Sequence, residues 1–271
     1  MKVLITGAAG FLGRRLTRAL LAANTTISDV SRIIAVDTTM SPIDDLRVDW
    51  RVGTVTDADF VAYVDTPVLF PIDSLPPTHS FVGPPLWEPT VPLPAWWGDL
   101  RQDRPLVYVT LGSSGQASLL PAVVHALCSL EASIVIATAA RARLPALPPN
   151  AYSADFLPGV QVARQADVVV CNGGSLTSYQ ALSGGTPVIG VASNLDQFLN
   201  MQAVEGIGAG VTLRADRFRP AELVGAARRV LATPTFETSA RRVADWCSEH
   251  PFAPAIRRVL QDIAQARGTR H

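Results

Sequence analysis

The stretch ADVVVCNGGSLTSYQALSGGTPVIG at residues 166–190 decides the fold. Its run Asp167–Cys171 has the length and β-branched composition of a buried strand, and the Asn172-Gly-Gly sequence that follows marks a tight turn. A helical segment comes next, and Pro187–Val191 forms a second apolar run. Strand, turn, helix and strand in this order are typical of a parallel sheet whose two faces are covered by helices.

The same alternation extends over residues 105–233, where helical segments carry apolar residues three to four positions apart. We therefore predict an α/β fold with a parallel, Rossmann-like sheet. Residues 235–265 add helices that are divided at Pro251 and Pro254. The predicted strands are Leu106–Leu111, Ser133–Thr138, Tyr152–Asp155, Asp167–Cys171, Pro187–Val191 and Gly210–Arg214.

Two further segments precede this domain. Residues 1–62 predict a truncated Rossmann-like βαβ half-lobe with strands at Val3–Thr6, Arg32–Asp37 and Trp50–Val55, followed by a short helix that runs through Tyr63. Residues 63–104 are a proline-rich linker, because prolines at this density prevent helix and central strand. Three tryptophans in the linker indicate that it packs along a domain surface. They are Trp87, Trp96 and Trp97. The remainder, residues 105–271, is the third part.

A glycine turn follows the first predicted strand and opens a helix. Gly7 permits the tight turn, Gly10 lets a diphosphate approach the backbone, and Gly13 lets the helix lie close to the strand. Asp37 ends the next strand, where a carboxylate accepts hydrogen bonds from an adenosine ribose and disfavours a ribose phosphate. This pattern predicts NAD binding, and the alternative is a glycine turn without a ligand.

The segments MKVLITGAAGFLGRRLTRALL and RIIAVD resemble the N-terminus of extended short-chain dehydrogenases and sugar epimerases. The resemblance covers residues 1–62 and implies NAD contacts by Gly7, Gly10, Gly13 and Asp37. That family uses a tyrosine and a lysine four residues apart for hydride transfer, whereas Lys2 is the only lysine in this chain. We therefore expect no dehydrogenase activity of this type.

Three polar loops follow predicted strands of the large domain. They are Gly112-Ser-Ser-Gly115, Asn172–Thr177 and Asn194–Gln197. Open parallel sheets bind ligands at the carboxyl ends of their strands, where free amides suit phosphate and carboxylate or amide oxygens suit sugar hydroxyls. The alternative is ordinary turn chemistry, with Ser175 and Asn194 as helix N-caps.

The segments VYVTLGSSG, ADVVVCNGGSLTSYQALSGGTPVIG and SNLDQFLNM resemble the donor-binding, C-terminal domain of GT-B glycosyltransferases that use UDP- or dTDP-sugars. The resemblance runs from about residue 66 to the C-terminus. It implies inverting transfer of a hexosyl group to a small-molecule or lipid hydroxyl acceptor, with no cofactor required. The implied donor-binding residues are Ser113, Ser114, Phe156, Pro158, Asn172, Gly173, Gly174, Ser175, Thr177, Gln180, Asp196 and Gln197.

Several positions depart from the family pattern. Asn172 replaces a phosphate-binding histidine and carries no charge, and Gln180 replaces a glutamate that holds the ribose hydroxyls. Phe156 still offers an aromatic ring to a pyrimidine, while Gly159 lacks the family's glutamine side chain.

The acceptor lobe of a GT-B enzyme is largely missing, and the sequence identifies no catalytic base. Two alternatives therefore remain: an NAD-binding module without the tyrosine–lysine pair, and an inactive fusion. The few strands of residues 1–62 leave a parallel edge uncovered, which favours a homodimer.

Composition excludes other classes. The 23 basic and 23 acidic side chains give no net charge, which argues against a nucleic-acid partner. Three scattered cysteines and four histidines have no metal-ligand spacing, so no metal site is expected. No apolar run reaches the ~20 residues of a membrane span, and no signal-peptide pattern occurs. We expect a cytoplasmic setting.

Overall fold

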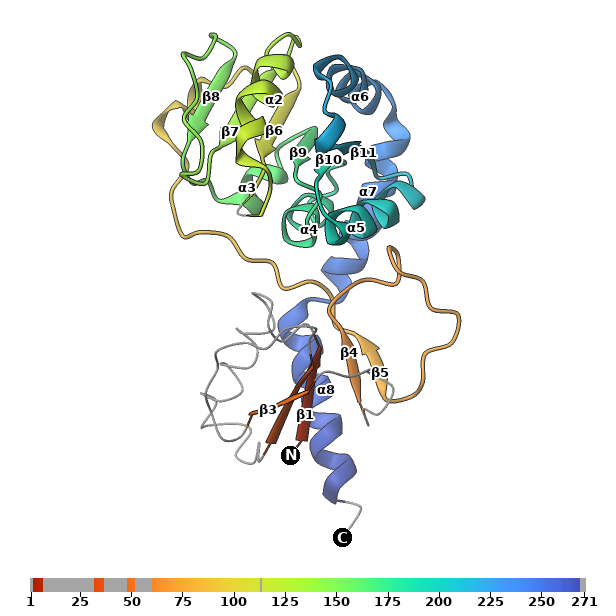
Figure 1. Ribbon diagram of the computed structural model, residues 1–271. Helices are drawn as coiled ribbons and strands as arrows, with labels where there is room; N and C mark the ends of the chain where they lie inside the picture. Colours follow the sequence, from red (N-terminus) through yellow and green to blue (C-terminus); the bar gives the residue numbers. More distant parts are fainter. Residues whose placement is uncertain (1, 7–31, 37–47, 52–59, 113, 269–271) are drawn as a thin grey trace. The chain divides into compact units, whose positions relative to one another are not determined.

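The structure is a computed structural model that describes residues 2–6, 32–36, 48–51, 60–112 and 114–268 (Figure 1). The chain forms two compact units. The small unit comprises residues 1–65, 72–85 and 251–271, and the large unit comprises residues 66–71 and 86–250. Among the described residues, no helix has the length and apolar character needed to cross a bilayer.

The first sheet of the small unit is parallel, in the order β1-β2-β3. Its strands are β1 (Lys2–Thr6), β2 (Arg32–Val36) and β3 (Val48–Arg51). The register pairs Thr6 with Val36, so β1 and β2 end side by side. The strands predicted near residues 3–6 and 32–37 are confirmed, and the third begins at Val48, before the predicted Trp50, while residues 52–55 of the prediction lie outside the described residues.

A second, two-stranded sheet in the small unit joins β4 (Val61–Tyr63) to β5 (His79–Phe81). The Tyr63 hydroxyl lies 3.0 Å from Nδ1 of His79 across this pair. The helix predicted through Tyr63 is therefore wrong at its end, because pairing with a strand 16 residues away overrides the local pattern. Helix α8 (Phe252–Gly268) belongs to the same unit.

The large unit contains a six-stranded, wholly parallel sheet in the order β11-β10-β9-β6-β7-β8. All six strands fall where the sequence predicts them. They are β6 (Leu106–Thr110), β7 (Ser133–Ala137), β8 (Ala151–Ala154), β9 (Val168–Cys171), β10 (Val188–Ala192) and β11 (Gly210–Arg214).

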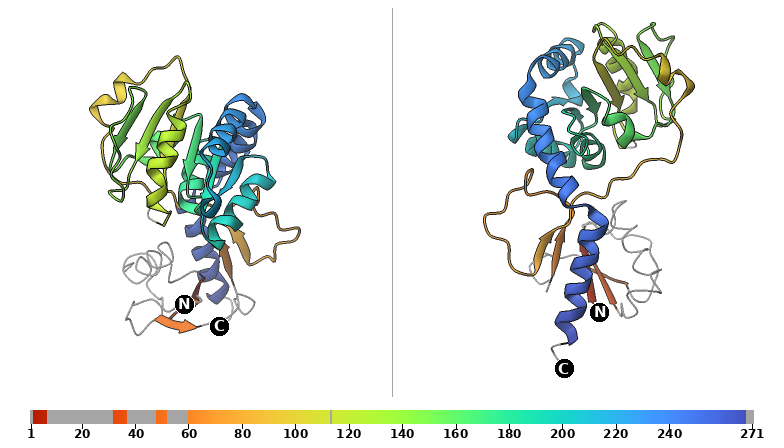
Figure 2. Two further views of the ribbon diagram at one scale, coloured as in Figure 1. Left: turned by 45° about the horizontal axis from the view of Figure 1, so that its top comes forward. Right: turned by 180° about the vertical axis from the view of Figure 1, so that it is seen from behind.

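Helices connect these strands and cover both faces of the sheet (Figures 1 and 2). They are α2 (Leu120–Leu127), α3 (Gly159–Ala163), α4 (Ser175–Leu182), α5 (Leu195–Gly206), α6 (Pro220–Ala232) and α7 (Pro234–Glu249). The break before α8 falls at Pro251, as predicted. Pro254 instead lies in the first turn of α8, where a missing N–H costs no intrahelical bond.

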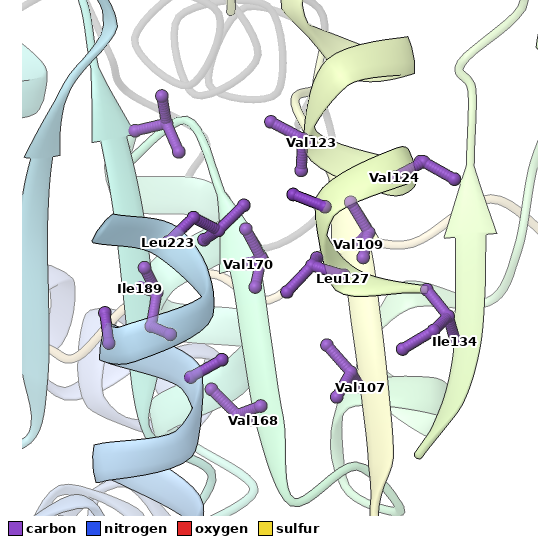
Figure 3. Packing of buried hydrophobic residues seen from close by; sticks show 14 of the residues in the cluster. Val107, Val109, Val123, Val124, Leu127, Ile134, Val168, Val170, Ile189 and Leu223 are labelled. Carbon is purple, nitrogen blue, oxygen red and sulfur yellow. The ribbon is translucent and has the colours of Figure 1, made fainter. Parts of the chain in front are cut away.

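The apolar strands supply one core on each face of the sheet, because successive side chains point to opposite faces. On one face, Val107, Val109 and Ile134 pack with α2 and α6 residues such as Leu127 and Leu223 (Figure 3). On the other, Tyr108, Val135 and Val169 pack with α4, α5 and α7. Strands buried on both faces explain why the sequence reads as continuous apolar runs rather than alternating ones.

Part of the linker packs against the second core, the one formed with α4, α5 and α7, as its tryptophans predicted. Residues 95–99 form a short 3-10 helix, η2 (Ala95–Asp99). Trp96 and Trp97 are partly buried against the second core, and the rings of Trp96 and Tyr152 lie 5.3 Å apart. The tryptophans thus hold in place part of a segment in which the prolines disfavour α-helix and central strand.

Leu127→Ala tests the first core. Leu127 lies at the end of α2 and is fully buried in the core between this helix and the sheet, so we expect the free energy of unfolding to fall by about 2–5 kcal/mol. The matched control is Leu195→Ala, because Leu195 is 73% exposed and its truncation should change stability by no more than about 0.5 kcal/mol. Urea unfolding followed by circular dichroism measures both, and equal losses would contradict the assignment of the core.

Candidate functional site

The strand order creates a switch point between β6 and β9. The chain runs outward through β7 and β8, then returns to pair β9 with the other side of β6. The loops that follow β6 and β9 therefore leave the same edge of the sheet in opposite directions. Open parallel sheets bind ligands at such a point.

The loop after β6 is shaped by glycines. Gly112 has φ +59, a left-handed conformation that favours glycine. A Cβ at Gly115 would overlap the carbonyl oxygen of Leu111, to which the Gly115 amide donates a 3.1 Å hydrogen bond. Ser114 is exposed beside them, and Ser113 lies outside the described residues. The backbone is thus bare where a phosphate could approach.

Asn172 joins this loop to the next one. Its side chain is 3% exposed, and its Nδ2 donates to Ser114 Oγ at 3.0 Å while its Oδ1 accepts from the Gly174 amide at 3.2 Å. Both ends of the amide are therefore engaged within the protein. The structure brings the predicted residues Ser114, Asn172 and Gly174 together, and gives Asn172 a bridging role between the loops.

The Asn172–Gly174 loop is held by a hydrogen bond and a close packing contact from α5. The Gly173 carbonyl accepts from Asn200 Nδ2 at 2.8 Å, and that nitrogen also donates to Ser178 Oγ at 3.1 Å. A Cβ at Gly173 would lie 2.6 Å from Met201 Cγ, so the left-handed turn and the close approach both require glycine. Asn200 is not among the site residues predicted from the sequence. The feature that could have indicated it is its position as a polar residue on the buried face of α5.

Cys171 lies directly under this turn. Its Sγ accepts from the Gly173 amide at 3.2 Å, and burial raises the pKa of the thiol to about 11. Burial likewise raises the pKa of Tyr108 on the neighbouring strand above its ordinary value. Both groups are neutral near pH 7 and act as core residues.

Helix α4 begins at this loop with Gly174, not Ser175, in the N-cap position. The cap predicted at Ser175 is wrong, because Gly174 has the extended backbone of a cap and Ser175 is already helical. A Cβ at Gly112 would lie 3.8 Å from Thr177 Oγ1, so the first turn of α4 faces the β6 loop.

The loop after β10 is held by hydrogen bonds of two side chains, those of Asn194 and Gln197. Asn194 caps α5, as predicted, since its Oδ1 accepts from the Gln197 amide at 3.0 Å. Gln197 is only 1% exposed, and its Oε1 accepts from the amide and hydroxyl of Ser193 at 2.8 and 3.0 Å. Its Nε2 is buried without a partner among the described residues. Asp196, in contrast, is exposed.

The linker contributes to the edge beyond β8. Phe156 is 53% exposed there, and Pro158 takes the N-cap position of α3. The carboxylate of Glu88 accepts from the Val160 and Gln161 amides at 2.7 and 3.1 Å, and so satisfies the start of α3. No local pattern indicates this role of Glu88, because it lies more than 70 residues from its partners.

Gln180 is tied to the same linker. Its Nε2 donates to the Trp87 carbonyl at 2.6 Å, and a Cβ at Gly159 would lie 3.0 Å from its Oε1. A glutamate at this position could not donate to a carbonyl, so the linker contact explains the amide. Because Gly159 has no side chain, the amide of Gln180 can occupy the space beside it.

The loop after β7 completes the edge. Nη1 of Arg141 donates to the carbonyl oxygens of Gly112 and Gly115, each at 3.1 Å. The sequence analysis did not single out Arg141.

A hollow of about 520 Å³ lies at the opposite end of the sheet, at the amino ends of β6 and β9. Both carboxylates that line it are already engaged, since Asp167 accepts from the Leu106 amide at 2.7 Å and Asp103 accepts from Arg101 at 2.9 Å.

Two other kinds of site are not part of this edge. In the described part of the chain, no three His, Cys, Asp or Glu side chains group as metal ligands. The predicted NAD contacts at Gly7, Gly10, Gly13 and Asp37 lie outside the described residues.

The strand order and the loops at the switch point define the class, since this is the fold of the nucleotide-binding domain of GT-B glycosyltransferases. Residues 121–263, more than half of the chain, match the model of the family described as erythromycin biosynthesis protein CIII-like, C-terminal domain. The chain belongs to this family.

Curated relatives point the same way. The chain is 50% identical over 190 residues to the PGL/p-HBAD biosynthesis rhamnosyltransferase of Mycobacterium tuberculosis (strain CDC 1551 / Oshkosh), covering 70% of this chain and 42% of the relative. It is 48% identical over 211 residues to a PGL/p-HBAD biosynthesis glycosyltransferase of M. tuberculosis (strain ATCC 25177 / H37Ra), covering 78% and 48%. The chain thus spans less than half the length of these relatives.

Among solved structures, the spinosyn rhamnosyltransferase SpnG superimposes with a TM-score of 0.68 at 22% identity, covering 96% of this chain and 72% of that one. The glycosyltransferase VinC, in complex with dTDP, gives a TM-score of 0.60 at 19% identity, covering 85% and 52%. These likenesses confirm the predicted fold class.

Gln180→Glu tests the linker contact. The introduced carboxylate would face the Trp87 carbonyl without a donor, so we expect the free energy of unfolding to fall by about 1–3 kcal/mol at pH 8. Protonation restores a donor, so the folded variant binds more protons than the unfolded one and its deficit should shrink as pH falls toward 5.

The matched control for this change is Gln202→Glu on the exposed face of α5. It should leave stability nearly unchanged at both pH values. Urea titrations at pH 5 and pH 8 make the comparison, and a deficit in Gln180→Glu that does not depend on pH would argue against the contact.

Proposed function

We propose that the large unit binds a UDP- or dTDP-sugar donor at the switch-point edge, for transfer of a hexosyl group to a hydroxyl acceptor. The observation that carries the proposal is the Asn172 bridge, which brings the bare backbone turns after β6 and β9 together. The amides of Gly115, Gly173 and Gly174 already donate within the protein, so the diphosphate would be held by the amides in the first turn of α4, because a helix N-terminus suits an anion. The glycosyltransferase relatives support the same reaction class, and two solved structures of this fold, those of VinC and SpnG, are complexes with thymidine diphosphate.

The other subsites follow from the exposed groups along the edge. Phe156 offers a ring face on which a pyrimidine can stack. Asp196 is the exposed carboxylate at the start of α5 and would accept hydrogen bonds from sugar hydroxyls. Gln197 would hold the loop that presents Asp196, with its buried Nε2 as the remaining donor.

The proposed reaction is inverting. The acceptor oxygen attacks the anomeric carbon as the bond to the diphosphate oxygen breaks, the electron pair leaves with the nucleoside diphosphate, and a base takes the hydroxyl proton. The amides in the first turn of α4 would stabilise the leaving diphosphate. We assign the base to no described residue. The acceptor is proposed as a small molecule or a lipid, and no cofactor is needed.

A donor-binding protein without turnover is the alternative. A relative named as an inactive PGL/p-HBAD biosynthesis glycosyltransferase of Mycobacterium bovis (strain BCG / Pasteur 1173P2) is 50% identical over 72 residues, or 27% of this chain. Release of UDP or dTDP from a sugar donor in the presence of a hydroxyl acceptor would exclude this alternative.

Asp196→Ala tests the sugar subsite. We expect it to weaken binding of a dTDP- or UDP-hexose about tenfold, the loss of roughly one hydrogen bond to a charged group, and to leave dTDP and UDP binding unchanged. The control is Asp245→Ala, an exposed carboxylate on α7. Isothermal titration calorimetry gives the constants. Equal losses for the sugar nucleotide and the free diphosphate, or no binding by the unaltered protein, would count against the subsite.

We also propose NAD binding at residues 7–37 as a second function, in keeping with the resemblance of residues 1–62 to dehydrogenases and epimerases. The supporting observation is the parallel β1–β2 pair. Its register pairs Thr6 with Val36, so both strands end at the same edge of the sheet.

Asp37→Arg tests this second proposal. A carboxylate that holds the adenosine ribose favours NAD, whereas an arginine accommodates the extra phosphate of NADP. We expect the variant to lose NAD binding and to gain NADP binding, as followed by thermal shift at millimolar ligand. Indifference of the protein to both dinucleotides before and after the change would rule out the NAD proposal.

A further inference from the structure

The turn after β7 has an unusual backbone. The Arg141 amide donates to the Thr138 carbonyl at 3.1 Å, and the two residues between them are left-handed alanines. Ala139 has φ 53 and Ala140 has φ 55. A left-handed backbone is unfavourable for a residue other than glycine, so the surrounding structure must hold this turn in place.

Hydrogen bonds to the end of β8 hold the turn. Thr138 Oγ1 donates to Asp155 Oδ1 at 2.6 Å and accepts from the Ala140 amide at 3.2 Å. The Ala139 amide donates to the Asp155 carbonyl at 2.8 Å. These three hydrogen bonds at the ends of two adjacent strands offset the backbone strain and fix the direction in which the turn leaves the sheet.

The fixed turn aims Arg141 at the loop after β6. Nη1 donates to the carbonyl oxygens of Gly112 and Gly115, each at 3.1 Å. Arg141 is itself exposed, and its Nε and Nη2 make no hydrogen bond or ion pair with any described residue. A guanidinium has five N–H groups, so three remain available to a ligand.

This bonding differs from that of other exposed arginines in the large unit. Several of them pair with a carboxylate within four residues, as Arg214 does with Asp216 at 2.9 Å and Arg219 with Glu222 at 3.2 Å. Arg141 has no carboxylate partner in the described part of the chain, and contacts only backbone carbonyls of a loop 26 and 29 residues away. The positive charge of Arg141 therefore has no carboxylate beside it among the described residues. Asn172, on the neighbouring loop, is neutral and adds no charge of its own.

We propose that Arg141 is the positioning residue for the donor diphosphate. It draws the Gly112 and Gly115 carbonyls toward itself, which sets the shape of the turn, and it offers its three remaining N–H groups and its charge to the diphosphate oxygens. The assignment rests on the proposed donor site. This role also accounts for the strained turn at Ala139 and Ala140, since strain of this kind is retained where it positions a functional group.

The test compares Arg141→Met with Arg143→Met by isothermal titration calorimetry, using inorganic pyrophosphate, dTDP, UDP and the nucleosides thymidine and uridine. Arg143 is exposed and makes no hydrogen bond or ion pair among the described residues, so it is the matched control. We expect Arg141→Met to weaken pyrophosphate and the nucleoside diphosphates about tenfold or more. Nucleoside affinity should change less than twofold, and Arg143→Met should change nothing.

Arg141→Lys keeps the charge but loses the planar fork, so its diphosphate affinity should fall between the other two. This variant also decides the matter if Arg141→Met does not fold. Equal losses for nucleosides and diphosphates would mean that Arg141 only maintains the fold, and unchanged diphosphate affinity would overturn its assignment alone. If the unaltered protein binds neither pyrophosphate nor the nucleotides, the proposed donor site fails together with it.

Discussion

The pairing of β9 with β6 is the constraint on which the rest of the large unit depends. The chain leaves β6, builds β7 and β8 on one side, and returns to add β9, β10 and β11 on the other. Both central strands are then buried on two faces, which demands apolar side chains in both directions and helices on both sides. The two loops that leave this pair have to share one edge. Gly115 tolerates no side chain because a Cβ there would overlap the Leu111 carbonyl oxygen and Asn172 Cβ, and Gly173 tolerates none because Met201 of α5 lies against it.

Buried amide side chains stabilise the edge that this pairing creates. Asn172 joins the first two loops, Asn200 holds the second loop on α5, and Gln197 holds the third. Each hydrogen bond contributes about 1 kcal/mol, but an unpaired buried group costs more, so the arrangement is specified by the need to satisfy its members. A backbone held in this way is already ordered before a ligand arrives, which limits the entropy lost on binding. The exception among the described residues is Nε2 of Gln197, which is buried without a hydrogen-bond partner.

The proline-rich segment is part of this architecture and not a passive connection. Trp96 and Trp97 pack on the second core, Glu88 satisfies the first amides of α3, and the Trp87 carbonyl accepts from Gln180. Prolines suit this role because they keep the backbone extended and leave its carbonyls and side chains available to the sheet. The same contact explains an amide at residue 180, where the resembling enzymes have a carboxylate.

The sequence by itself determined the α/β class, the six strands of the large unit and the polar loops at their ends, because buried parallel strands require long apolar runs broken by glycine turns. It also predicted the Asn194 cap, which depends on neighbouring residues alone. It misplaced the cap at Ser175 and predicted a helix end at Tyr63, since a backbone conformation and a strand partner 16 residues away decide those positions. Only the tertiary structure decided that Asn172 bridges two loops, that Glu88 and Gln180 belong to the linker contact, and that Arg141 reaches Gly112 and Gly115. These contacts join residues 26 to 93 positions apart, and no local pattern encodes an interaction whose geometry is set by the order of strands in a sheet.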